Sequence, residues 1–277
     1  MPMFALNVKR LTLLLIAALA AVSGWRLGYA AVLPQAAVAA AVAIVLDAAV
    51  ALVRTKKLVW SDSGAITGLI VAGVAAPSSP LLMVALATLI AIASKHLLAA
   101  KRRNVFNPAA VGLLVGTLLL GLRLSWWVDA NHLLTIVAGS VLLAKFAGRW
   151  RLVLSFLGLF AAAIAARSLF MGHAVIPDLY LNISIASFFV FFMATDPRTS
   201  PVMVRDLPLY AAVMAAGAFV SVVYHPMSLF LGGLLLANLV ALGLNHRALR
   251  PRAPAPKPAP QVPVVPAAPS AVPPVAN

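Results

Sequence analysis

The sequence predicts an all-α membrane protein with about ten transmembrane helices. Of its 277 residues, 63% are hydrophobic and only 10% are charged, which leaves too little polar surface for a soluble domain of this size. Apolar stretches of membrane-spanning length recur along the chain, and short basic clusters separate them. The net charge of +15 therefore indicates the topology of a multi-pass protein in a lipid bilayer, and nucleic-acid binding is not expected.

Ten apolar stretches are the expected spans, and a Pro-rich segment follows them. The stretches cover residues 11–24, 30–53, 63–76, 80–100, 108–122, 130–146, 151–170, 178–195, 208–224 and 227–245. We expect residues 1–250 to form the transmembrane domain, with the first stretch kept as an uncleaved anchor. Residues 251–277 carry ten prolines among Ala and Val, which predicts a disordered cytoplasmic tail.

The loops between these stretches differ in charge. Seventeen Lys and Arg residues fall in alternate loops and toward the two ends of the chain, against three in or near the other loops. The positive-inside rule places the richer side in the cytoplasm of a bacterial inner membrane, together with both termini. The chain has no cysteine, which excludes Cys-ligated iron–sulfur clusters and thiol chemistry. Any redox reaction here would need a bound cofactor.

The third stretch, 63–76, is short. Its 14 or so residues make about 21 Å of helix, against about 30 Å of hydrocarbon. It begins after Ser-Asp-Ser-Gly and ends at Pro77. A discontinuous helix that lines a site has this form. A short helix that is enclosed by other helices would have the same length and the same ends. Both interpretations stay open.

Three polar junctions lie on the expected cytoplasmic side, where apolar stretches begin or end. They are SDSGAITGL (61–69), RRNVFNPAAVG (102–112) and FFMATDPRTSP (191–201). Taken one at a time, the first two junctions are explained by helix caps and the third by a turn at a helix end before Pro197. The alternative is that helix N-termini at 62–64 and 107–109 point into a shared cavity for an anionic or electron-rich ligand. The candidate binding residues are Asp62, Ser63, Gly64, Thr67, Asn107, Pro108, Thr195 and Asp196.

Other charged residues give further candidates. Lys95, His96 and the 101–103 basic run could add cationic contacts to such a cavity, although a topology signal explains the run equally. Asp47 lies inside the second stretch, so it is a candidate for an ion path or a carboxylate hydrogen-bonded to a neighbouring helix. The outer-side histidines show no metal-ligand spacing, and no metal site is expected.

The three junctions carry a family resemblance. SDSGAITGLIVAGVAAP (61–77), SKHLLAAKRRNVFNPAAVG (94–112) and FFMATDPRTSP (191–201) resemble motifs of the RnfD/NqrB family, in matching order and spacing. That family supplies membrane subunits of ion-translocating electron-transport complexes. The chain is similar in length to short RnfD-like members, including the UnbU type. The resemblance implies two five-helix halves in opposite orientation, similar to urea-channel architecture.

The resemblance also implies a flavin. Relatives active in electron transfer carry FMN on a threonine of an S-G-A-T type motif in an outer loop, and no such motif stands in an outer loop here. SGAIT at 63–67 is a near match on the expected cytoplasmic side. We therefore expect FMN or riboflavin to be held non-covalently, if at all, in a subunit that needs other membrane or redox subunits and does not act as an enzyme alone. The alternatives are a small-solute or ion channel of the same fold without redox activity, and a scaffold.

Overall fold

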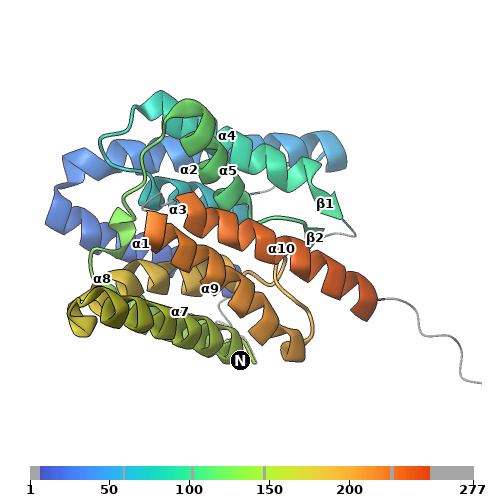
Figure 1. Ribbon diagram of the computed structural model, residues 1–277. Coiled ribbons are helices and arrows are strands. Elements are labelled where there is room, and N and C mark those ends of the chain that lie inside the picture. Colours follow the sequence, from blue (N-terminus) through green and yellow to red (C-terminus); the bar gives the residue numbers. More distant parts are fainter. Residues whose placement is uncertain (1–6, 59, 101–102, 146–147, 225–227, 250–277) are drawn as a thin grey trace, which may run out of the picture.

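The computed structural model describes residues 7–58, 60–100, 103–145, 148–224 and 228–249, and this part of the chain is almost entirely helical (Figure 1). The expected all-α class is confirmed, and apolar helices together form a multi-pass membrane protein. The expected Pro-rich tail, 251–277, lies outside the described residues, as do two members of the 101–103 basic run.

Within the described residues, each of the ten expected stretches coincides with one α-helix. The helices are α1 (Val8–Leu27), α2 (Tyr29–Thr55), α3 (Asp62–Val74), α4 (Leu81–Leu97), α5 (Pro108–Leu120), α6 (His132–Leu143), α7 (Trp150–Met171), α8 (Val175–Phe188), α9 (Leu207–Tyr224) and α10 (Ser228–Ala248). By length and composition, five segments of the described chain can cross a membrane, while α3, α4, α5 and α6 are shorter apolar helices.

Three short elements join the helices. A two-stranded antiparallel hairpin, β1 (Ala99–Ala100) and β2 (Arg103–Asn104), links α4 to α5. One 3₁₀ turn, η1 (Trp127–Asp129), precedes α6 and another, η3 (Val204–Asp206), precedes α9. These elements set the direction in which the following helix leaves.

The eighth helix differs from the expected continuous α-helix over 178–195. Its last six residues form a π-helix, η2 (Phe189–Ala194), which is buried along its whole length. A π-turn inserts an extra residue into a helical turn and is frequent at functional sites. It ends directly before Thr195 and Asp196, so it sets where the third junction lies.

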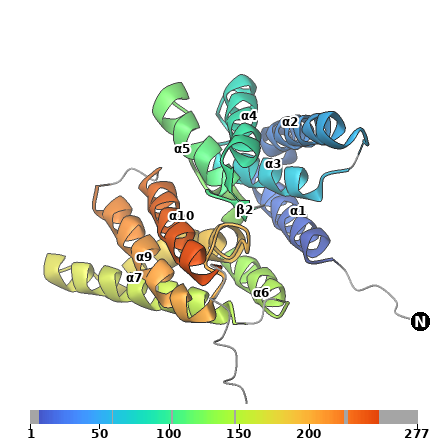
Figure 2. The same cartoon turned by 90° about the vertical axis from the view of Figure 1, so that its right-hand side faces the viewer.

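The same pairs of helices pack together in the first five and in the last five. In the first group α2 contacts α3 and α4, and α4 contacts α5; in the second, α7 contacts α8 and α9, and α9 contacts α10. Figure 2 shows the first five helices, in blue to green, grouped apart from α7, α9 and α10. The two groups meet where α5 contacts α10 and α1 contacts α6.

Gly217 of α9 and Gly233 of α10 bring their helices into backbone contact. A Cβ at Gly217 would lie 2.4 Å from the Gly233 Cα, whereas a Cβ at Gly232 would meet open space. We expect Gly217→Ala to force the helices apart and cost about 1–3 kcal/mol. Gly232→Ala is the matched control and should be neutral or stabilise by up to about 1 kcal/mol, because Ala favours helix. Thermal unfolding in detergent, followed by Trp fluorescence, measures both, and equal midpoints would contradict the expectation.

Candidate functional site

Side chains cap the N-termini of α3 and α5. Ser61 Oγ accepts a hydrogen bond from the Gly64 N–H (2.9 Å), and Asn107 Oδ1 accepts one from the Ala110 N–H (3.1 Å). Pro108 occupies the first turn of α5, where its missing N–H costs nothing. The remaining free N–H groups of both first turns make these ends electropositive.

The third junction is a turn held by arginines. The Arg198 N–H donates to Asp196 Oδ1 (2.9 Å), so the carboxylate closes the turn around Pro197. Arg103 Nη2 donates to the Pro197 carbonyl (2.5 Å) and to the Ser200 carbonyl (2.8 Å). Arg149 Nη1 donates to Ser200 Oγ (2.6 Å). Arg103, which belongs to the basic run, therefore holds the third junction in place.

These three junctions meet at one end of the helical bundle, called the junction end below, around a cavity of about 290 Å³. Six of the eight candidate residues line this junction cavity: Ser63, Thr67, Asn107, Pro108, Thr195 and Asp196. Phe192, Ile66 and Ile70 supply apolar walls. The structure thus brings together segments that are more than one hundred residues apart, and their role in binding stays a prediction.

A second cavity of about 350 Å³ adjoins the first at the junction end. Asn7, Lys9, Ser63 and Arg198 line both, and the second also contacts Arg54, Lys95 and His96, so we call it the basic cavity. Asp62 lines this second cavity instead of the first. Its carboxylate accepts a hydrogen bond from Trp60 Nε1 (2.9 Å) and lies 3.6 Å from Arg10 Nε.

Gly64 is buried and lines neither cavity. A Cβ at this position would lie 3.0 Å from the Ala43 carbonyl oxygen of α2. Gly64 therefore allows α3 to pack closely on α2. Of the eight candidate binding residues, it is the one whose role is helix packing.

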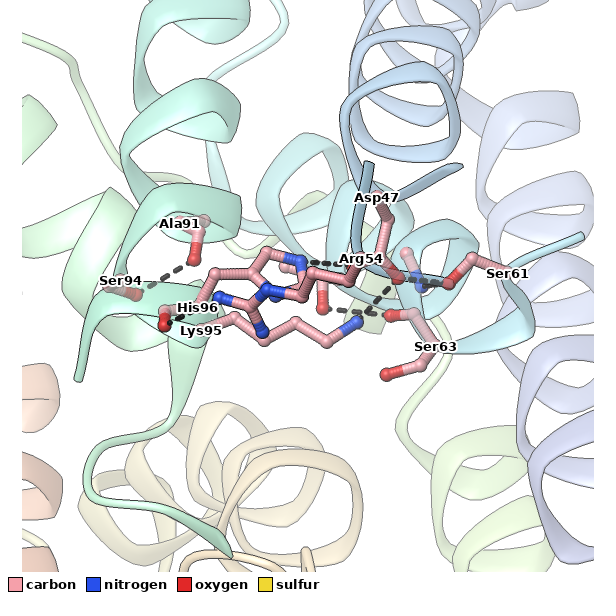
Figure 3. A network of polar contacts seen from close by, with 10 residues as sticks. Asp47, Arg54, Ser61, Ser63, Ala91, Ser94, Lys95 and His96 are labelled. Carbon is pink, nitrogen blue, oxygen red and sulfur yellow. Dashed lines mark hydrogen bonds and ion pairs between the residues drawn. The ribbon is translucent and has the colours of Figure 1, made fainter. Parts of the chain in front are cut away.

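Asp47 of α2 holds the basic cavity together (Figure 3). Its Oδ2 lies 2.6 Å from Lys95 Nζ and its Oδ1 lies 2.6 Å from His96 Nε2, both on α4. Ser61 Oγ, the cap of α3, also donates to this carboxylate. One buried carboxylate thus links α2, α3 and α4. Arg54 Nη2 donates to the His96 carbonyl (3.5 Å) instead of to Asp47.

Positive charge dominates the surroundings of Asp196. Burial raises the pKa of the Asp196 carboxyl, while the Arg198 N–H and the charges of Arg198, Arg103 and Arg149 act in the opposite direction. Burial also lowers the pKa of the Arg103 and Arg149 guanidinium groups. Charges in such a partly dry site interact more strongly than in water. The junction cavity is therefore lined by residues of two helix N-termini, Ser63 and Asn107, and by Asp196 and Arg198.

Sequence comparison finds a family match in the N-terminal part of the molecule. Residues 5–132, which hold the first two of the three junctions, match a family model. The matching family is described as NQR2, RnfD, RnfE. The resemblance inferred from the junction motifs is confirmed over these residues, and FFMATDPRTSP lies beyond them. No curated protein matches the chain.

Two groups of residues at or next to the junction cavity were not predicted from the sequence. Asn238 of α10 accepts from the Asn107 N–H (2.9 Å) and donates to the Tyr210 hydroxyl (2.7 Å), which anchors the start of α5. A side-chain amide within an apolar helix indicates a hydrogen bond to a neighbouring helix, and this signal could have identified Asn238 from the sequence. Lys9 and Thr12 of α1 also line the junction cavity, and nothing in the local sequence distinguishes them.

Proposed function

We propose that this chain is an RnfD-like membrane component of an Rnf/Nqr-type electron-transport system and that it holds a flavin non-covalently in the junction cavity. The observation that carries the proposal is the cavity of about 290 Å³ at which the family's motifs converge. Ligand-binding pockets of proteins have volumes from about 300 Å³ upward, so the junction cavity lies at the lower end of this range. The adjoining basic cavity adds to the available volume.

The proposed topology is ten spans in two five-helix halves of opposite orientation. An odd number of spans per half requires that inversion, and the repeated packing of α2 to α5 and α7 to α10 supports it. The junction end would face the cytoplasm of a bacterial inner membrane, because it carries the basic loops. Electron transfer to or from a soluble donor would then need partner subunits on that side.

The residues present fit a flavin by their chemistry. Phe192, Ile66 and Ile70 offer apolar surface to a planar ring system, while Asp196 and Ser63 offer hydrogen-bond acceptors and donors at its edges. Lys9 and Arg198, where the two cavities join, suit an anionic substituent. A bound flavin supplies the one- and two-electron chemistry that a cysteine-free chain lacks.

Asp47 was a candidate for an ion path, and we infer that it positions the site instead. Its carboxylate is occupied by Lys95, His96 and Ser61, so its charge is neutralised within the protein. Through Ser61 it fixes the first turn of α3, which lines both cavities through Ser63.

A visible absorption spectrum of the purified protein, before and after acid precipitation, tests the proposal. We expect flavin bands that pass into the supernatant, because the sequence carries no S-G-A-T type motif in an expected outer loop. Flavin that stays in the pellet would contradict non-covalent binding. A colourless protein would overturn the flavin proposal and favour the solute or ion channel, or a scaffold.

Asp196→Asn tests the cavity itself. The amide oxygen can still accept from the Arg198 N–H, so the turn should persist, but the negative charge offered to the ligand is lost. We expect the flavin dissociation constant to rise about tenfold, the effect of losing one charged hydrogen bond. Asp206→Asn, at a carboxylate outside both cavities, is the matched control. Loss of folded protein in gel filtration would assign Asp196 to helix termination instead.

A further inference from the structure

The basic cavity holds cations that its acids do not neutralise. Asp47 Oδ2 already lies 2.6 Å from Lys95 Nζ, and the second acid, Asp62, has its Oδ2 3.6 Å from a cation outside the cavity. The remaining Lys and Arg residues of the lining are Lys9, Arg54 and Arg198. In the described part of the chain, none of these three has a carboxylate within 4.0 Å. A cavity lined by unpaired charges of one sign attracts a ligand of the opposite sign, here an anion.

Hydrogen-bond donors accompany these charges. Asp62 and Ser63 line the cavity and begin α3, so their backbone N–H groups have no acceptor within the helix. Arg54 uses Nη2 for the His96 carbonyl (3.5 Å), and its other N–H groups donate to none of the described residues. Guanidinium groups and helix N-termini both bind phosphate well, because its several oxygens accept hydrogen bonds and carry negative charge. The anion that fits this set of donors is a phosphate group.

The edge of the basic cavity is apolar as well as charged. Trp60 lines the cavity and is 65% exposed, and Val50 and Ala51 of α2 belong to the same lining. Val53 and Leu97, which adjoin cavity residues in sequence, are exposed too. Tryptophan at the ends of membrane helices lies at the level of the lipid headgroups. A ligand here therefore meets cations and apolar side chains together, as an amphiphile would.

We propose that the basic cavity binds the headgroup phosphate of an anionic phospholipid, whose acyl chains lie against the ends of α2 and α4. These two helices pack on each other, and the cavity takes residues from both. Basic pockets between helices on the cytoplasmic side are known to bind anionic lipid headgroups. Arg54 lines this cavity and not the junction cavity, so its role can be separated from the proposed flavin site.

Native mass spectrometry of the full-length protein in detergent tests the site, with phosphatidylglycerol and phosphatidylcholine as probes. We expect the anionic lipid to be retained at least about fivefold more than the zwitterionic one, since each nearby Lys or Arg contributes about 1 kcal/mol. Arg54→Gln should lower retention of phosphatidylglycerol about fivefold for the same reason. Lys57→Gln is the matched control and should bind like the wild type, because it removes an exposed charge from the same end of α2 without lining the cavity.

Inorganic phosphate distinguishes a lipid from a soluble ligand. An excess of phosphate should leave phosphatidylglycerol bound, because the acyl chains add apolar contacts that free phosphate lacks. Displacement of the lipid by phosphate would overturn the lipid assignment. Equal retention of the two lipids would overturn it too, as would equal retention of phosphatidylglycerol by Arg54→Gln and Lys57→Gln.

Thermal unfolding guards against lipid that is retained in the detergent micelle without a site. A ligand that binds only the folded state raises the unfolding midpoint. Phosphatidylglycerol should raise the midpoint of the wild type and of Lys57→Gln, and raise that of Arg54→Gln much less. The same rise in all three proteins would contradict the proposal. A colourless protein that still shows the expected pattern would overturn the flavin proposal alone, so the two proposals can fail separately.

Discussion

Replacing Lys95 by Met is expected to cost about 3–5 kcal/mol of stability, the usual effect of removing one partner of a buried ion pair. Lys95 and Asp47 side chains are each 7% exposed, and Nζ lies 2.6 Å from Oδ2. Without the ammonium group, the Asp47 charge stays buried with only His96 and Ser61 as partners. We expect the variant to unfold at a clearly lower temperature than the wild type.

A double-mutant cycle identifies the cause of that loss. Asp47→Asn combined with Lys95→Met removes both charges and should recover much of the stability, since a matched pair is often worth little against neutral side chains. Lys9→Met, at an exposed cation of the same cavity, is the control and should unfold like the wild type. If Lys95→Met also unfolded like the wild type, the ion pair would have no structural role.

Replacing Ser63 by Trp is expected to remove the flavin while the protein stays folded. Ser63 lines both the junction cavity and the basic cavity, so a large ring at this position would occupy the space where they join. Its side chain is only half-buried, which lets the new ring enter the cavity without overpacking the core. We expect the flavin dissociation constant to rise at least about a hundredfold, an effect of about 3 kcal/mol.

The measurement is the ratio of flavin absorbance to protein after gel filtration. Val53→Trp is the matched control, because Val53 is 72% exposed, lies on the neighbouring helix α2 and lines neither cavity. Full flavin content in Ser63→Trp would place the cofactor elsewhere. Equal loss in both variants would point to damage of the fold instead of the cavity.

The helices and the caps of this molecule could be predicted because their causes are local. Long apolar runs leave no alternative to helix in a bilayer, where each backbone polar group must be bonded within its own segment. Ser61 and Asn107 were recognisable as caps for the same reason, since the bonded N–H groups lie three residues away. The π-helix before Thr195 was not recognisable, because the sequence FVFFMA reads equally as α-helix.

Contacts between distant segments could not be predicted from the sequence as the helices and their caps could. Asp47 and Lys95 are both polar residues in apolar runs, yet nothing in their spacing indicates that α2 and α4 bring them within 2.6 Å. Asp62 was placed with the junction cavity by sequence, whereas the structure turns it toward the basic cavity and Arg10.

The sequence by itself determined that this chain is an all-α membrane protein, where its helices run and which family residues 5–132 match, because these follow from hydrophobic runs and short motifs. The tertiary structure alone decided that Ser63, 107–108 and 195–198 line one cavity and that Asp47 is paired with Lys95. The physical reason is that cavities and buried charges depend on how helices pack, and helix packing joins residues that the chain keeps far apart.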